Sequence, residues 1–97
     1  MRISLSAEAK AEANEAVDWY IGKEAIYAAS DFADALDHAL AMLRQFPYLG
    51  GQGALSTRIL PLHTFPYSLV YRIQEDTVRV IAIAHQNRRP AYWAGRL

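Results

Sequence analysis

The C-terminal segment AHQNRRPAYW brings a histidine, two arginines and two aromatic residues into one short stretch. His85 can act as an acid or a base near neutral pH. Arg88 and Arg89 can bind phosphates or carboxylates, while Tyr92 and Trp93 can stack on a nucleobase or pack onto a core. The segment is therefore a candidate for an active site, for a contact with an anionic partner, or for an ordered tail.

Each of these residues also has a purely structural interpretation. A histidine at the end of an apolar strand most often hydrogen-bonds a nearby backbone group or carboxylate. The two arginines are equally well explained as solvated side chains or as partners of acidic helices. The aromatic pair is typical of a tail that packs onto the core.

Charge is unevenly divided between the two halves of this neutral chain. Residues 1–50 hold eight acidic side chains against four basic ones, whereas residues 51–97 hold six basic side chains against Glu75 and Asp76. All six are arginines: Arg58, Arg72, Arg79, Arg88, Arg89 and Arg96. The asymmetry predicts an anionic partner for the second half, which can be nucleic acid, an acidic protein segment or the chain's own first half.

Length and composition exclude several classes of protein. A chain of 97 residues forms one domain, residues 1–97, and 53% hydrophobic residues exclude a disordered chain. No cysteine is present, and the three histidines lack the spacing of metal ligands, so we expect no disulfide, no metal and no cofactor. No segment resembles a membrane span or a signal peptide, and we expect a cytoplasmic protein.

Helical periodicity dominates the first half. Ser6 is a candidate N-cap, and apolar positions recur at intervals of three and four residues up to Gly22. A second amphipathic helix is expected over about residues 24–45, with Ile26, Phe32 and Leu43 among its apolar positions. Because the connection is short, the two helices should form an antiparallel hairpin.

From Arg58 onward the apolar period changes to two. Strands are expected in TRILPLH, YSLVYRI and EDTVRVIAIAH, with a hairpin turn at QED. The last strand should be central, with Val80 and Ala82 on one face and Ile83 on the other. The initial RISLS can join the sheet, which gives an α+β fold of order β-α-α-β-β-β with an antiparallel sheet packed against the N-terminal helical hairpin.

Several segments in the same order carry a family resemblance. FPYSLVYRI, a turn, and then VRVIAIAHQNRRPAYW resemble the RelE/ParE superfamily of bacterial toxins, specifically its ParE-like, plasmid-stabilisation branch. EANEAVDWY and the FP before a glycine-rich loop resemble the same branch. The resemblance implies the toxin of a type II toxin-antitoxin system, which inhibits DNA gyrase and replication and is neutralised by a ParD-like antitoxin.

A second branch of the superfamily gives a different reading. RelE-like toxins are ribosome-dependent endoribonucleases of messenger RNA, and here their basic set would fall on Arg58, Arg72, His85, Arg88 and Tyr92. The chain departs from that pattern, since residues 51–97 contain no lysine and Ser68 replaces the arginine found before the LVY segment. We therefore assign no catalytic residue under the ParE-like reading. The third alternative is a non-toxic relic that only binds the antitoxin.

The resemblance and the charge pattern together nominate two binding sets. The expected target-binding residues are Arg88, Arg89, Tyr92 and Trp93. The expected antitoxin-binding residues are Trp19, Tyr20, Arg58, Arg72 and Arg79, with Arg58 and Arg72 forming one cationic face. The resemblance also implies a heterodimer or heterotetramer with the antitoxin, contact with operator DNA only through the antitoxin, and no membrane.

Overall fold

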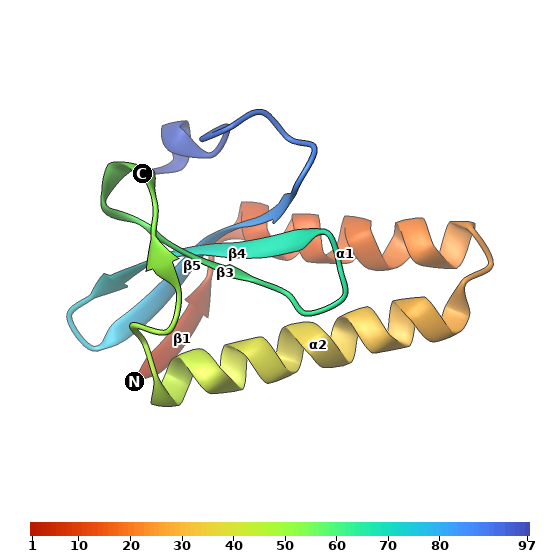
Figure 1. Cartoon of the computed structure of the whole chain (residues 1–97), viewed down its shortest axis with the longest axis horizontal. Helices are drawn as coiled ribbons and strands as arrows, with labels where there is room; N and C mark the ends of the chain where they lie inside the picture. The colour runs from red at the N-terminus through yellow and green to blue at the C-terminus, as the bar shows by residue number, and fades with distance from the viewer.

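The computed structural model describes residues 1–97 and has the α+β architecture that the periodicity predicts (Figure 1). The elements in chain order are β1 Arg2–Leu5, α1 Ala7–Gly22, α2 Ile26–Gln45, β2 Gly51–Gln52, β3 Arg58–Pro61, β4 Tyr67–Gln74 and β5 Thr77–His85. Short 3-10 helices lie at Ala54–Ser56 and Ala94–Arg96. The two-residue β2 is the one strand that the sequence pattern did not predict. Neither helix combines the length and apolar character required to cross a bilayer.

The two helices form the expected hairpin. The Ser6 hydroxyl accepts a hydrogen bond from the backbone N–H of Ala9 at 3.0 Å, which caps α1. The buried stripe of α2 comprises Ala29, Phe32, Leu36, Ala39 and Leu43. Ile26 is expected on this stripe but is exposed, because it is the first residue of α2, next to the connection between the two helices.

The sheet is mixed rather than wholly antiparallel. Its strand order is β1-β5-β4-β3-β2, and β1 runs parallel to β5 while the other pairs are antiparallel. Because β1 is parallel to β5, and β4 is antiparallel to both β5 and β3, β3 and β5 run in the direction of β1. The predicted antiparallel pairing of RISLS is therefore wrong.

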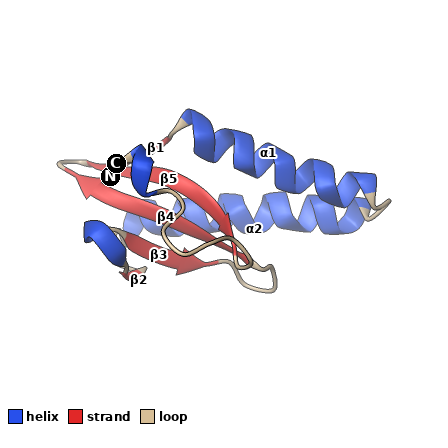
Figure 2. Cartoon of the chain, turned by 90° about the horizontal axis from the view of Figure 1, so that it is seen from above, coloured by secondary structure: helices blue, strands red, loops and turns tan.

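The sheet is covered on both faces at its centre. The helices cover one face, whose core includes Phe32, Leu69 and Tyr71. The C-terminal tail covers part of the other face, where Trp93 packs with Val70 and Ile81 (Figure 2). This arrangement confirms that β5 is a central strand with two apolar faces.

A β-bulge alters the alternation that the sequence predicts for β5. The register shifts between Val70 and Tyr71, so that Tyr71 lies opposite Val80 and Val70 lies opposite Ala82. Val80 faces the helices as predicted, but Ala82 packs on the tail side and Ile83 on the helix side. The predicted faces of Ala82 and Ile83 are therefore exchanged, because a bulge inserts one extra residue into the alternation.

Candidate functional site

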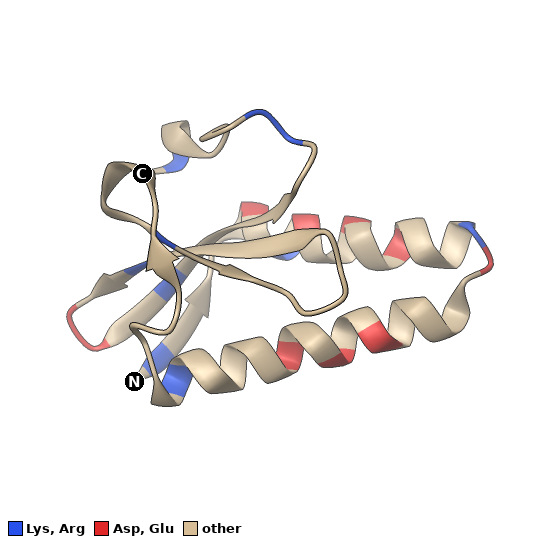
Figure 3. Ribbon diagram, in the orientation of Figure 1, with Lys and Arg blue, Asp and Glu red and all other residues tan.

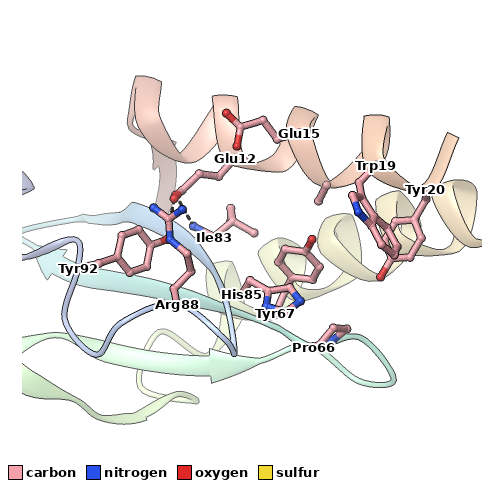
Figure 4. A pocket seen from close by; sticks show the side chains of 11 residues that line it. Glu12, Glu15, Trp19, Tyr20, Pro66, Tyr67, Ile83, His85, Arg88 and Tyr92 are labelled. Atoms are coloured by element: carbon pink, nitrogen blue, oxygen red, sulfur yellow. Dashed lines mark hydrogen bonds between the residues drawn. The ribbon is translucent and has the colours of Figure 1, made fainter. Parts of the chain in front are cut away.

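A groove of about 380 Å³ lies between α1 and the adjoining ends of β4 and β5 (Figure 4). Trp19 and Tyr20 from α1 and Tyr67 from β4 provide aromatic walls. His85 and Arg88 lie at its open side, where β5 continues into the tail. The groove therefore combines apolar surface with a few polar groups, as binding sites for peptides and small molecules do.

Glu12 closes one end of this groove. Strand β1 stops at Leu5, so β5 has no strand partner on that side beyond Val80. The Glu12 carboxylate accepts the otherwise unpaired N–H of Ile83 at 3.0 Å. Arg96 donates to the Ile81 carbonyl at 3.0 Å. Side chains thus replace the missing strand, which satisfies backbone groups that would be costly to leave unpaired.

The same carboxylate fixes the tail. Arg96 donates to Glu12 Oε1 at 2.8 Å and to Oε2 at 3.1 Å, a bidentate ion pair. The Tyr92 hydroxyl donates to Oε2 at 2.6 Å. The side chains of Glu12 and Arg96 are only 13% and 18% exposed, so the pair is shielded from solvent.

The pKa shifts of Glu12 and Tyr92 indicate that neither group changes its protonation state near neutral pH. Burial raises the pKa of the Glu12 carboxyl, but hydrogen bonds from Arg96, Tyr92 and the Ile83 N–H outweigh it and hold that pKa below the usual 4.5. Burial and the hydrogen bond to Glu12 raise the pKa of the Tyr92 hydroxyl. At neutral pH Glu12 is therefore ionised and Tyr92 protonated, which suits an anchor rather than a proton relay.

The open side of the groove is chemically different. The Asn87 N–H donates to His85 Nδ1 at 3.0 Å, which leaves Nε2 to carry the proton of the neutral ring. The His85 ring meets Tyr67 edge-on, with centroids 5.0 Å apart. Arg88 stacks on the Tyr92 ring at 4.2 Å and has no acidic partner within ion-pair distance. Arg88 is therefore an exposed cation available to a partner.

All four expected target-binding residues line a second hollow of about 310 Å³ on the tail side of the sheet, but only two of them also line the groove. Those two are Arg88 and Tyr92, whereas the exposed Arg89 and the buried Trp93 line only the second hollow. Trp93 is only 4% exposed and packs on the sheet face away from the helices. Its ring therefore packs the tail onto the core, and the small part of Trp93 that stays accessible faces the second hollow.

The expected antitoxin-binding set is divided as well. Trp19 and Tyr20 line the groove, and Trp19 is 57% exposed. Arg58 lies away from the groove, where it donates to the Gly50 carbonyl at 2.7 Å and stacks over Tyr48.

Arg58 and Arg72 do not form the expected cationic face. Arg58 lies directly opposite Tyr71 and so shares its side of the sheet, which is the helix side. Arg72 follows Tyr71 along β4 and therefore belongs to the other side, where it lies opposite Arg79. The residues expected for a RelE-like enzyme are separated for the same reason, because only His85, Arg88 and Tyr92 meet at the groove.

Glu12 and Glu15 are functional-site residues that the sequence interpretation missed. Both belong to the polar positions of the first helix, and both line the groove. The available signal was the small residues around them in AEAKAEANEA, since alanines allow a sheet and a tail to approach a helix closely. No group of three or more histidine or acidic side chains is arranged to hold a metal ion.

The comparisons with known proteins agree with this architecture. Residues 3–90 match the family described as "ParE toxin of type II toxin-antitoxin system, parDE". A solved structure titled "Chromosomal ParDE TA system from P. aeruginosa" superposes with a TM-score of 0.77 at 18% identity, over 88% of this chain and 95% of that chain. No curated protein matches the chain. Since the family match covers nearly the whole sequence, the chain belongs to the ParE toxin family of type II toxin-antitoxin systems.

Proposed function

We propose that this ParE-family toxin inhibits DNA gyrase and replication and is held inactive by a cognate ParD-like antitoxin. The observation that carries the proposal is the groove, which has Trp19 and Tyr20 at one end and Arg88 and Tyr92 at the other (Figure 4). Exposed aromatic and arginine side chains around a concave surface are typical of protein interfaces. The protein would meet gyrase in the cytoplasm.

The groove is better suited to a protein segment than to RNA cleavage. Glu15 lines it without an ion-pair partner and would repel a phosphate backbone. Tyr92 is already hydrogen-bonded to Glu12, and Arg58 and Arg72 lie elsewhere. These features favour binding over a RelE-like ribonuclease, which needs a base, an acid and cations around one phosphate.

Two members of each expected binding set line this groove, which suggests how the antitoxin acts. An antitoxin segment seated on Trp19 and Tyr20 would also cover Arg88, the exposed cation we assign to the target. Neutralisation would then be competition for one surface. In the resulting heterodimer or heterotetramer, operator DNA would be contacted only by the antitoxin.

Supercoiling of relaxed plasmid by purified gyrase tests this function. We expect the chain to inhibit the reaction and the antitoxin encoded beside it to restore activity. Trp19→Ala should still inhibit gyrase but resist the antitoxin, whereas Arg88→Ala should inhibit weakly and still bind the antitoxin. Cleavage of ribosome-bound messenger RNA without an effect on gyrase would support the ribonuclease instead. Antitoxin binding with neither activity would support the non-toxic relic.

A further inference from the structure

Two arginines oppose each other on the sheet face that the helices do not cover. Arg72 of β4 and Arg79 of β5 are directly paired across the antiparallel ladder, and both are half-buried. Residues paired in this way project from the same face and lie side by side. Arg79 donates to the hydroxyl of Ser4, its neighbour on β1, at 2.5 Å. Arg72 and Arg79 are called the arginine pair below.

The arginine pair has no neutralising partner in the chain. Arg96 is the one arginine of the second half that forms an ion pair with a helix acid. Figure 3 shows most acidic positions along the two helices, whereas Arg72 and Arg79 belong to strands and face away from them. Like charges placed directly opposite destabilise a sheet. No acid of the chain offsets these two positive charges, which leaves them for an external anion.

We propose that the arginine pair is a second docking site on this toxin, which binds carboxylates from an acidic segment of the antitoxin. The inference rests on the proposed function, because it names the antitoxin as the partner. Each guanidinium group offers several donors that match carboxylate oxygens.

The surroundings favour an acidic peptide over nucleic acid. Glu75 and Asp76 form the turn that follows the arginine pair along the β4 and β5 hairpin, and Arg2 beside them already pairs with Asp76 at 3.8 Å. A phosphate backbone requires an extended basic surface, and these carboxylates interrupt it. A short peptide segment with one or two acidic side chains can bind through the arginine pair alone.

The arginine pair is separate from the groove. The groove lies on the helix side of the sheet, while Trp93 and the apolar residues beneath it occupy the tail side next to the pair. A segment that fills the groove therefore leaves the arginines uncovered. The antitoxin would need a second segment across this face, which adds affinity without competing with the first contact.

The test variant carries both Arg72→Gln and Arg79→Gln. The charge-matched control carries both Lys10→Gln and Arg44→Gln, whose residues are exposed on the helices. The dissociation constant for the neighbouring antitoxin is measured between 50 and 300 mM salt. We expect the test variant to bind about tenfold or more weakly at low salt and to show a shallower salt dependence, with the control close to wild type. We also expect its Tm without antitoxin to stay within about 2 °C of wild type, because the variant removes no ion pair and no buried apolar side chain.

The outcomes separate the inference from the proposed function. Wild-type affinity in the test variant would overturn the second site and leave the groove proposal standing. Binding of a 20-base-pair DNA duplex that disappears in the test variant, with antitoxin binding unchanged, would assign the pair to nucleic acid and overturn it as well. Failure of the wild-type chain to bind the antitoxin would contradict both proposals together.

Discussion

The tail contains two adjoining segments that differ in how they are held. Residues 86–90 are all exposed, and Arg88 and Arg89 among them have no acidic partner. Residues 91–96 are anchored, because Trp93 is buried and Arg96 is bound to Glu12. The Tyr92 ring lies at the boundary, with the Arg88 guanidinium at 4.2 Å and that of Arg96 at 5.1 Å from its centre.

This difference shows that residue type alone does not assign a role. Arg88 and Arg96 both contact the same ring, yet Arg96 satisfies a shielded carboxylate while Arg88 offers its charge to solvent. Removing the partner of a buried charge destabilises a fold, whereas removing an exposed charge changes its stability little. Substitutions in the anchored segment should therefore change the stability of the fold, and substitutions in the exposed segment should change binding to the target.

Trp93→Ala should give the largest loss of stability. It removes a buried aromatic ring from the small cluster with Val70, Ile81 and Ala82, at a cost of about 3 to 5 kcal/mol in the free energy of unfolding. Urea denaturation followed by circular dichroism measures this loss. The matched control is Trp19→Ala, which should cost about 1 kcal/mol or less because Trp19 is exposed. Equal losses in the two variants would contradict the anchoring role.

Glu12→Gln should have the next largest effect. Gln can still accept from the Ile83 N–H but leaves the shielded Arg96 without its counter-charge, which we expect to cost about 2 kcal/mol. Glu15→Gln is the control, because Glu15 is an exposed acid on the same helix with no ion pair. A wild-type free energy of unfolding for Glu12→Gln would show that the tail does not depend on this carboxylate.

The contribution of Glu12 should also depend on pH. Because folding lowers the pKa of this carboxyl below 4.5, its stabilisation is complete above that pH and is lost as the pH falls through the folded-state pKa. The difference in unfolding free energy between wild type and Glu12→Gln should therefore be constant from pH 6 to 8 and shrink below about 4.5. Urea titrations at several pH values test this, and a difference that grows in acid would contradict the assignment.

Arg88→Ala combined with Arg89→Ala should have the smallest effect on stability. Only the stacking of Arg88 on Tyr92 is lost, so the unfolding free energy should change by about 1 kcal/mol or less. The concentration that half-inhibits gyrase should nevertheless rise by about tenfold or more. Lys10→Ala with Arg44→Ala is the charge-matched control. Unfolding of the first variant would mean that the exposed segment is also structural.

Much of the fold could be predicted from local patterns. The Ser6 cap, the helix end near Gly22 and the central position of β5 follow from capping and periodicity, and the structure confirms them. The parallel pairing of β1 and the bulge at Val70 could not be predicted, because both depend on the path of the whole chain. The bulge alone exchanged the faces expected for Ala82 and Ile83.

The site was predicted less completely than the fold. His85, Arg88 and Tyr92 were nominated from their spacing, and they do meet in one groove. Glu12 was missed because its partner Arg96 lies 84 positions away, and no local pattern relates the two. The grouping of Arg58 with Arg72 failed because the register of β3 and β4 decides which side chains share a face.

The most direct test of the account is to induce the chain alone in bacterial cells and follow the incorporation of labelled thymidine, uridine and methionine over the first minutes. If the protein acts on gyrase, thymidine incorporation should stop first and the SOS response should follow, while methionine incorporation continues. If methionine incorporation stops first and messenger RNA is cleaved, the toxin acts at the ribosome and the gyrase proposal is contradicted.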